Sequence, residues 1–143
     1  MAHDWALIRL QDLLPVKPLP VRNVSQQVFE QKTGSFETAR AGYGADRPYL
    51  LSVHRGCSAG VAADEPGLML NECDSRAGDS GSPILLLRAG DAFLIGLSSG
   101  ATFEWSADTG YVALASLGAS AASFGDALTN VQENRVISEL EYK

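Results

Sequence analysis

Short apolar runs, separated by residues that favour turns, make up most of the hydrophobic pattern of this chain. Ile84–Arg88 and Phe93–Ser99 flank a turn at residues 89–91 and predict a hairpin that is buried on both faces. Phe36–Ala41 and Gly110–Ala115 are runs of the same kind and predict two further strands. The pattern therefore indicates short strands joined by tight turns, which is typical of an all-β fold.

Two more strands and a disulfide are predicted around the turn Asp64–Gly67. Tyr49–Cys57 precedes this turn and Leu68–Cys73 follows it, so the two runs are expected to pair. Their pairing would bring Cys57 and Cys73 close together and favours a disulfide, which implies an oxidising compartment. Such a bond would contribute about 3 kcal/mol by chain-entropy arguments. The alternative is a pair of free buried thiols in a cytosolic protein.

The two ends of the chain differ from this middle region. Trp5–Leu10 predicts a strand, and three prolines within residues 11–22 exclude a helix and favour an extended linker. Val24–Gln31 is a possible strand, and Ser120–Asn130 predicts a short helix. Roughly six strands followed by this helix predict a small antiparallel β-barrel.

Composition excludes several classes of function. The 143 residues, of which 45% are hydrophobic, suit one folded domain rather than a disordered chain. A net charge of −6 argues against nucleic-acid binding, and no apolar run is long enough to span a bilayer. Two cysteines without clustered histidines do not make a zinc site, so neither a metal nor a cofactor is expected. Asp4 and Arg9 interrupt the first residues, so an export signal is expected upstream of this sequence.

The segment that carries chemistry is Gly78-Asp79-Ser80-Gly81-Ser82-Pro83. A serine nucleophile needs an exposed hydroxyl and backbone N–H groups that converge on one point nearby. Gly78 and Gly81 permit a tight backbone that exposes both. The segment differs from the elbow of α/β-hydrolases, because Ser82 stands where that motif has a glycine and no strand-to-helix pattern follows. Ser80 is therefore the candidate nucleophile.

This segment resembles the active-site motif of trypsin-like and glutamyl-endopeptidase-like serine proteases, and Gly42–Pro48 with Cys73-Asp74-Ser75 is similar to their bacterial branch. The resemblance covers roughly Asp4–Ala115. It implies that this chain is the C-terminal half of a chymotrypsin-fold protease, whose second barrel is an antiparallel six-stranded Greek-key barrel followed by a short C-terminal helix. The expected divisions are the last strand of a truncated first barrel (1–10), an inter-barrel linker (11–23), the C-terminal β-barrel with the nucleophile (24–117), and a helix and tail (118–143).

A second match lies at the start of the chain, where Asp4–Leu10 looks like the family's D-x-A-L-x-x-L strand. In that family the aspartate is buried, accepts an N–H from the catalytic imidazole and fixes its tautomer. The resemblance therefore assigns Asp4 as a catalytic residue. The alternative is a solvated N-terminal carboxylate.

The catalytic histidine precedes this aspartate in the family, and only two histidines are available here. His3 is adjacent to Asp4, and neighbours on a strand point to opposite faces, so it is a poor candidate. His54 would give the order Asp, His, Ser of subtilisins, whose alternating strands and helices are absent from this pattern. We therefore expect the histidine to lie in a missing N-terminal barrel, with His54 as the less favoured base.

The resemblance also implies roles for residues around the nucleophile. The backbone N–H groups of Gly78 and Ser80 would form the oxyanion hole. Ser98 and Gly100 would lie on the strand that pairs with the substrate backbone. Substrate binding is assigned to Asp74, Ser75, Ser98, Gly100 and Gly110.

Asp74 has two interpretations. In trypsins an aspartate six residues before the nucleophile, which is its position here, sits at the bottom of the specificity pocket and binds Arg or Lys. The alternative is that Asp74 bonds backbone in its loop, since bacterial relatives often carry an acidic residue here without tryptic specificity. Ser98 stands where glutamyl endopeptidases have a histidine, which argues against a preference for acidic residues.

The sequence thus predicts a serine endopeptidase that hydrolyses peptide bonds through an acyl-enzyme on Ser80. Its expected partners are a polypeptide substrate and the missing N-terminal barrel, and the fragment alone is expected to be inactive. The resemblance implies a secreted or periplasmic bacterial protein. The alternative is a non-catalytic peptide- or protein-binding module derived from a protease half.

Overall fold

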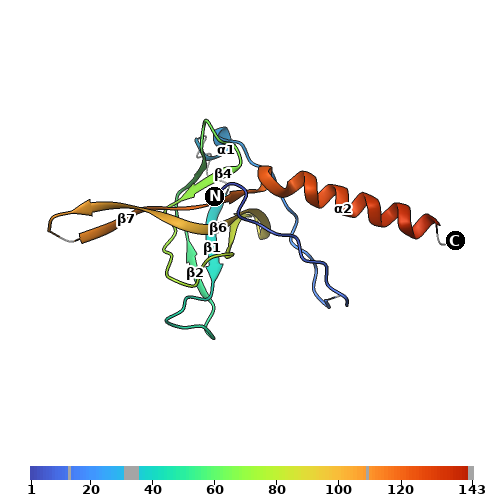
Figure 1. Ribbon diagram of the computed structural model, residues 1–143, viewed down its shortest axis with the longest axis horizontal. Helices are drawn as coiled ribbons and strands as arrows, with labels where there is room; N and C mark the ends of the chain where they lie inside the picture. The colour runs from blue at the N-terminus through green and yellow to red at the C-terminus, as the bar shows by residue number, and fades with distance from the viewer. Residues whose placement is uncertain (13, 31–35, 109, 142–143) are drawn as a thin grey trace.

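The computed structural model describes residues 1–12, 14–30, 36–108 and 110–141. Within them the chain is mostly β, with one curved sheet and two helices (Figure 1). The strands are β1 (Glu37–Gly42), β2 (Ser52–Arg55), β3 (Ala59–Val61), β4 (Leu68–Asn71), β5 (Pro83–Arg88), β6 (Asp91–Ser106) and β7 (Gly110–Ser120), and the helices are α1 (Gln26–Glu30) and α2 (Ala121–Glu141).

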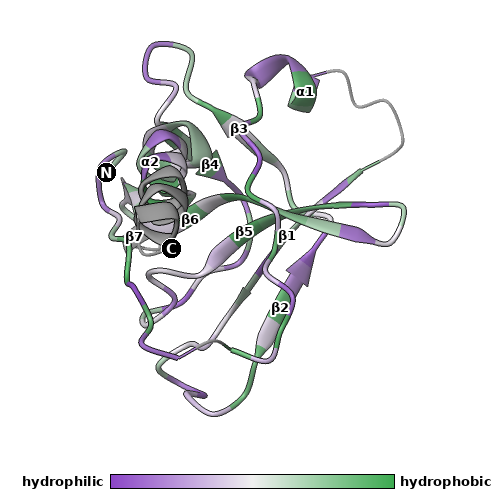
Figure 2. Cartoon of the chain, turned by 90° about the vertical axis from the view of Figure 1, so that its right-hand side faces the viewer, coloured by the Kyte–Doolittle hydropathy of each residue, from purple (hydrophilic) through white to green (hydrophobic). Residues whose placement is uncertain are grey.

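The sheet has the strand order β2-β1-β5-β6-β7-β4-β3, and all of its neighbouring strands are antiparallel. It curves into half of a barrel, with β2 and β3 at its two ends (Figure 2). The predicted all-β class is confirmed at this level. The described residues contain seven strands, where the sequence predicted about six.

The hairpin β5–β6 forms where the pattern predicted it. Arg88 pairs with Asp91 across a turn in which Ala89 and Gly90 both have positive φ, at 50° and 91°. A two-residue turn with two positive φ values matches the twist of the strands that it joins. Beyond the turn, the side chains of Ile84 and Ile95 are fully buried.

Two clusters of buried apolar side chains hold the sheet and helices together. The first joins the curved sheet to α1, and the second joins the end of β7 to the first turn of α2. Trp5 packs against the second cluster, with its ring centroid 6.1 Å from that of Phe124. The first cluster contains Phe29, Val61, Met69, Ile84, Leu86 and Ile95.

The predicted pairing of Tyr49–Cys57 with Leu68–Cys73 is wrong. β2 pairs with β1, while β4 pairs with β3 and β7. Gly56, with φ of 74°, turns the chain out of β2, and the short strand β3 then becomes the hairpin partner of β4. The disulfide between Cys57 and Cys73 is nevertheless present, with 4.9 Å between the Cα atoms. It joins the residues that flank the β3–β4 hairpin.

The N-terminal predictions also need correction. Trp5–Leu10 contains no strand, and within Val24–Gln31 the described residues form α1 instead of a strand. The helix forms because Phe29 can then enter the core while Gln26 Oε1 accepts the N–H of Val61 at 2.8 Å. The described residues of 11–23 contain no helix, and two backbone hydrogen bonds of 2.9 Å join Pro20 and Arg22 to Leu94.

The C-terminal helix is longer than predicted. Its first turn packs on the sheet through Ala121 and Phe124, and the rest of α2 leaves the body of the molecule (Figure 1). Neither helix in the described part of the chain has the length and apolar character needed to cross a membrane.

Candidate active site

Ser80 lies in the loop between β4 and β5, and its side chain is exposed. Gly78 and Gly81 on either side have φ values of 93° and 85°, a conformation that glycine adopts without steric cost. The Ser80 hydroxyl donates a hydrogen bond of 3.2 Å to the carbonyl oxygen of Ser99 on β6. The sequence prediction of an exposed serine on a glycine-dependent loop therefore matches the geometry.

The segment that follows β1 packs against the loop that carries Ser80. The N–H of Ala45 donates to the carbonyl of Ala77 at 2.7 Å. A Cβ on Gly78 would lie 2.7 Å from the nitrogen of Ala45, so the two backbones approach too closely for any other residue. Outside this contact, Arg76 forms an exposed ion pair of 2.5 Å with Asp46. The segment after β1 thus fixes the position of the residues just before Ser80.

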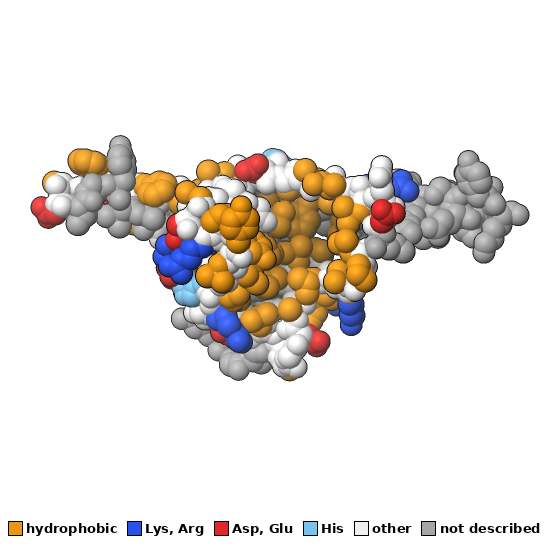
Figure 3. Space-filling view, turned by 90° about the horizontal axis from the view of Figure 1, so that it is seen from below, with side chains coloured by type: hydrophobic (Ala, Val, Ile, Leu, Met, Phe, Trp, Pro, Cys, Tyr) orange, Lys and Arg blue, Asp and Glu red, His pale blue; other side chains and the backbone are white. Residues whose placement is uncertain are grey.

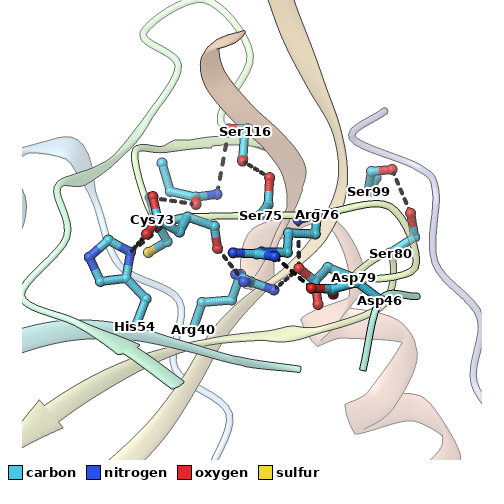
Figure 4. A network of polar contacts seen from close by, with 12 residues as sticks. Arg40, Asp46, His54, Cys73, Ser75, Arg76, Asp79, Ser80, Ser99 and Ser116 are labelled. Atoms are coloured by element: carbon cyan, nitrogen blue, oxygen red, sulfur yellow. Dashed lines mark hydrogen bonds and ion pairs between the residues drawn. The ribbon is translucent and has the colours of Figure 1, made fainter. Parts of the chain in front are cut away.

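A buried ion pair anchors the residue next to Ser80 (Figure 4). Asp79 Oδ2 lies 2.8 Å from Arg40 Nη1, and each side chain is only 4% exposed. The same carboxylate oxygen accepts the N–H of Arg76 at 2.7 Å. Arg40 also donates through Nη2 to the carbonyl of Asp74. The Arg40 guanidinium on β1 therefore contacts this loop at two points, at Asp74 near its start and at Asp79 next to Ser80.

Sequence reasoning missed Arg40. The sequence feature that could have indicated a buried role for Arg40 is its position as the single arginine of Glu37–Gly42, a strand made largely of small residues. A buried arginine requires a charged or polar partner, and nothing in the sequence selects Asp79 among the carboxylates. Gly42 belongs to the same cluster, because a Cβ there would lie 2.0 Å from Ser82 Oγ and 2.9 Å from Asp79 Oδ1.

His54 contacts Asp74, at the start of the loop. Its Nδ1 accepts the N–H of Asp74 at 2.6 Å and lies 3.8 Å from the Asp74 carboxylate, whose side chain is 92% exposed. The Asp74 carboxylate is therefore exposed beside His54 and does not lie at the bottom of a buried pocket. In this geometry His54 serves as a support for the loop, because its Nδ1 is already engaged there.

The serine-rich side of the loop faces β7. Ser75 Oγ lies 2.8 Å from Ser116 Oγ, and Ser116 is buried. Ser98 is also buried, and its backbone bonds both Gly81 and Ser82. Ser99 was not singled out from the sequence, although its carbonyl is the group that contacts the Ser80 hydroxyl.

Other predicted site residues lie elsewhere. Asp4 is exposed rather than buried, and its backbone N–H donates to the carbonyl of Met1. Gly110 pairs with Ser106 at the far end of the β6–β7 hairpin, so the structure does not bring it to the nucleophile loop. Gly100 follows Ser99 on β6, and a Cβ there would lie 3.1 Å from the Met1 side chain.

The buried ion pair beside Ser80 is that of Arg40 and Asp79. Farther away, on the sheet edge, the hydrogen bond from Arg55 to Glu37 raises the pKa of that guanidinium. Among the described residues, no group of three or more His, Cys, Asp or Glu side chains is arranged to hold a metal ion. The described site can therefore offer an exposed hydroxyl, constrained backbone N–H groups and one buried ion pair.

No family model and no curated protein matches this chain.

Proposed function

We propose that this chain carries the nucleophile of a serine endopeptidase, and that Ser80 attacks the carbonyl carbon of a peptide bond. The observation that carries the proposal is an exposed Ser80 between two glycines of positive φ, on a loop anchored by the buried Asp79–Arg40 pair. A nucleophile needs such a loop because hydroxyl and N–H groups must be held in place before the reaction.

The proposed reaction has two steps. The Ser80 oxygen forms an ester with the substrate acyl group while a histidine accepts the hydroxyl proton and then gives it to the leaving amine. Water, deprotonated by the same histidine, then releases the acid and restores Ser80. The N–H groups of Gly78 and Ser80 are the proposed donors to the negatively charged oxygen, and losing one such donor typically costs about 10²–10³ in turnover.

The histidine is proposed to come from another barrel that packs on this chain. His54 is engaged with Asp74, and Asp4 is exposed and therefore accessible to a partner. Exposed large apolar side chains gather in two segments, 7–19 and 43–53, that reach the lower side of Figure 1. Figure 3, viewed from that side, shows hydrophobic side chains around a hollow. Such a surface fits a protein partner.

The substrate side chain is proposed to meet hydroxyl groups. Ser75 and Ser116 form the uncharged pair beside the nucleophile loop, whereas the carboxylate of Asp74 points to solvent. We therefore favour a preference for uncharged residues over the Arg or Lys preference that Asp74 suggested. The disulfide supports a secreted or periplasmic location, because such bonds persist in oxidising compartments.

The test is hydrolysis of a fluorogenic protein substrate by the chain alone and by the chain expressed with the coding sequence upstream of Met1. We expect activity only in the longer protein, and none in its Ser80→Ala variant. Ser58→Ala, at an exposed serine outside the loop, is the matched control and should retain full activity. Equal hydrolysis by the Ser80→Ala variant would contradict the proposal.

The rival function is a non-catalytic peptide- or protein-binding module. The exposed apolar side chains favour it as much as they favour a second barrel. A true start codon at Met1, together with inactivity of every longer protein, would support the module. A histidine-bearing segment upstream that restores hydrolysis would support the enzyme.

A further inference from the structure

His54 and Asp74 make two contacts that depend in opposite ways on the charge of the imidazole. The Nδ1 atom of the ring accepts the backbone N–H of Asp74 at 2.6 Å (Figure 4). The same nitrogen lies 3.8 Å from Oδ2 of the Asp74 carboxylate. A protonated imidazole carries an N–H at both ring nitrogens and can no longer accept a hydrogen bond. The backbone contact therefore requires the neutral ring, whereas the carboxylate contact favours the charged ring.

The surroundings of His54 leave the Asp74 carboxylate as the partner for a charged ring. His54 lines a cavity of about 140 Å³ together with residues of β1, of the segment after β1 and of the loop after β4. The charged residues that line this cavity are Arg40, Asp46, Arg47, Asp74, Arg76 and Asp79. Each of the arginines has an ion-pair partner in Asp46 or Asp79. Among the described residues, the ion-pair partner of Asp74 is His54.

The backbone at Asp74 is held by groups on both sides of its peptide units. Its N–H is bound by His54, and its carbonyl oxygen accepts from Arg40 Nη2. When Nδ1 is protonated, two donors face each other, so the ring and this N–H must move apart. The Asp74 carboxylate, which is 92% exposed, is free to turn toward the charged ring. Protonation thus exchanges a bond that fixes the backbone for a bond to a mobile side chain.

We propose that His54 is a pH-sensitive switch, which fixes the start of the loop that carries Ser80 when neutral and releases it when protonated. Histidine is the side chain whose charge changes most readily between about pH 5 and 8. The bond to the backbone N–H is therefore present at the upper end of this range and is lost as the pH falls. Asp74 lies six residues before Ser80, so the consequence for reactivity rests on the proposed function.

The test follows the backbone amide of Asp74 by NMR in the 143-residue chain between about pH 8 and pH 5. We expect its hydrogen-exchange protection factor to fall roughly tenfold as the His54 ring becomes protonated, because the N–H loses its acceptor. In His54→Asn the side-chain oxygen can replace Nδ1 as acceptor and carries no charge, so the protection should stay constant. His3→Ala, at the only other histidine, is the matched control and should show the same fall as the unmodified chain.

Asp74→Asn tests the exchange of partners, because it keeps the backbone N–H and removes the carboxylate charge. The protonated ring then lacks its partner, so the midpoint of the fall in protection should move to lower pH. A midpoint that is unchanged or higher would overturn the proposal. Constant protection while the ring is titrated, or a fall that persists in His54→Asn, would also overturn it.

The consequence for Ser80 is measured as the rate of fluorophosphonate labelling in the protein expressed with its upstream coding sequence. The proposed catalytic histidine also loses reactivity on acidification, so the readout is the ratio of the His54→Asn rate to the unmodified rate. We expect this ratio to rise roughly threefold from about pH 8 to pH 6. A constant ratio would overturn the effect on Ser80. Absence of labelling at every pH would reject the proposed function alone, because the Asp74 amide decides the switch independently.

Discussion

At the scale of single residues, the buried ion pair between Arg40 and Asp79 anchors the loop that carries Ser80. Both side chains are almost completely buried, and the guanidinium also bonds the carbonyl of Asp74. Removing one partner of a buried ion pair leaves an uncompensated buried charge, and this strongly destabilises the folded protein.

Arg40→Leu should therefore lower the free energy of unfolding by about 3–5 kcal/mol. The measurement is urea denaturation under identical oxidising conditions. Arg76→Ala is the control, because it removes an exposed pair with Asp46 and should cost about 1 kcal/mol or less. Similar losses in the two variants would show that the buried pair has no special role.

Gly42 tests how closely this cluster is packed. A Cβ at residue 42 would overlap Ser82 Oγ and crowd Asp79, so Gly42→Ala should destabilise the protein by roughly 1–3 kcal/mol. Gly125→Ala, on the helix and with no atom within 4 Å of the added Cβ, should stabilise it by about 0.5–1 kcal/mol. Thermal unfolding of both variants gives the comparison, and a neutral Gly42→Ala variant would contradict the described packing.

The sequence could predict the residues of the site whose role is local. Gly78 and Gly81 flank Ser80 within one short motif, and their positive φ values follow from that motif. Arg40 could not be predicted, because its partner Asp79 is distant in sequence and only the fold brings them together. Asp4 was expected to be buried, but burial depends on packing that the sequence motif does not contain.

At the scale of elements, the hairpins with short turns were predictable and the longer-range pairings were not. The pairing of β5 with β6 follows from two apolar runs on either side of a two-residue turn. The sequence did not indicate that β2 pairs with β1, because a longer segment separates these two strands. It also did not indicate the short strand β3, which lies between β2 and β4 and pairs with β4. The cysteines were paired correctly from an incorrect strand pairing, since β4 is one strand of both the predicted and the observed hairpin and each hairpin has the two cysteines near its open end.

The disulfide between Cys57 and Cys73 should stabilise the folded protein at the β3–β4 hairpin. Replacing both Cys57 and Cys73 by Ala should lower the free energy of unfolding by about 3 kcal/mol, mainly because the unfolded chain is no longer closed into a loop. Reducing the unmodified protein with dithiothreitol before urea denaturation should give a similar loss. If neither treatment changes the midpoint, the bond contributes nothing to folding.

At the scale of the whole molecule, the half-barrel sheet presents the exposed Ser80 on its loop and many exposed apolar side chains. The segments 7–19 and 43–53 expose apolar side chains that a folded protein usually covers. The hydrophobic pattern predicted a folded β domain, but it did not show that the β6–β7 hairpin extends beyond the other strands (Figure 1). We propose that another segment or barrel completes the site at Ser80.

The most direct test of that account is to locate the adduct of a fluorophosphonate probe by peptide mapping. With the upstream segment present, we predict one adduct on Ser80, lost in Ser80→Ala and retained in Ser58→Ala, whose altered serine is exposed outside the loop. The chain alone should remain unlabelled. An adduct on another residue, or strong labelling of Ser80 in the chain alone, would contradict the account, and the second result would return His54 as the base.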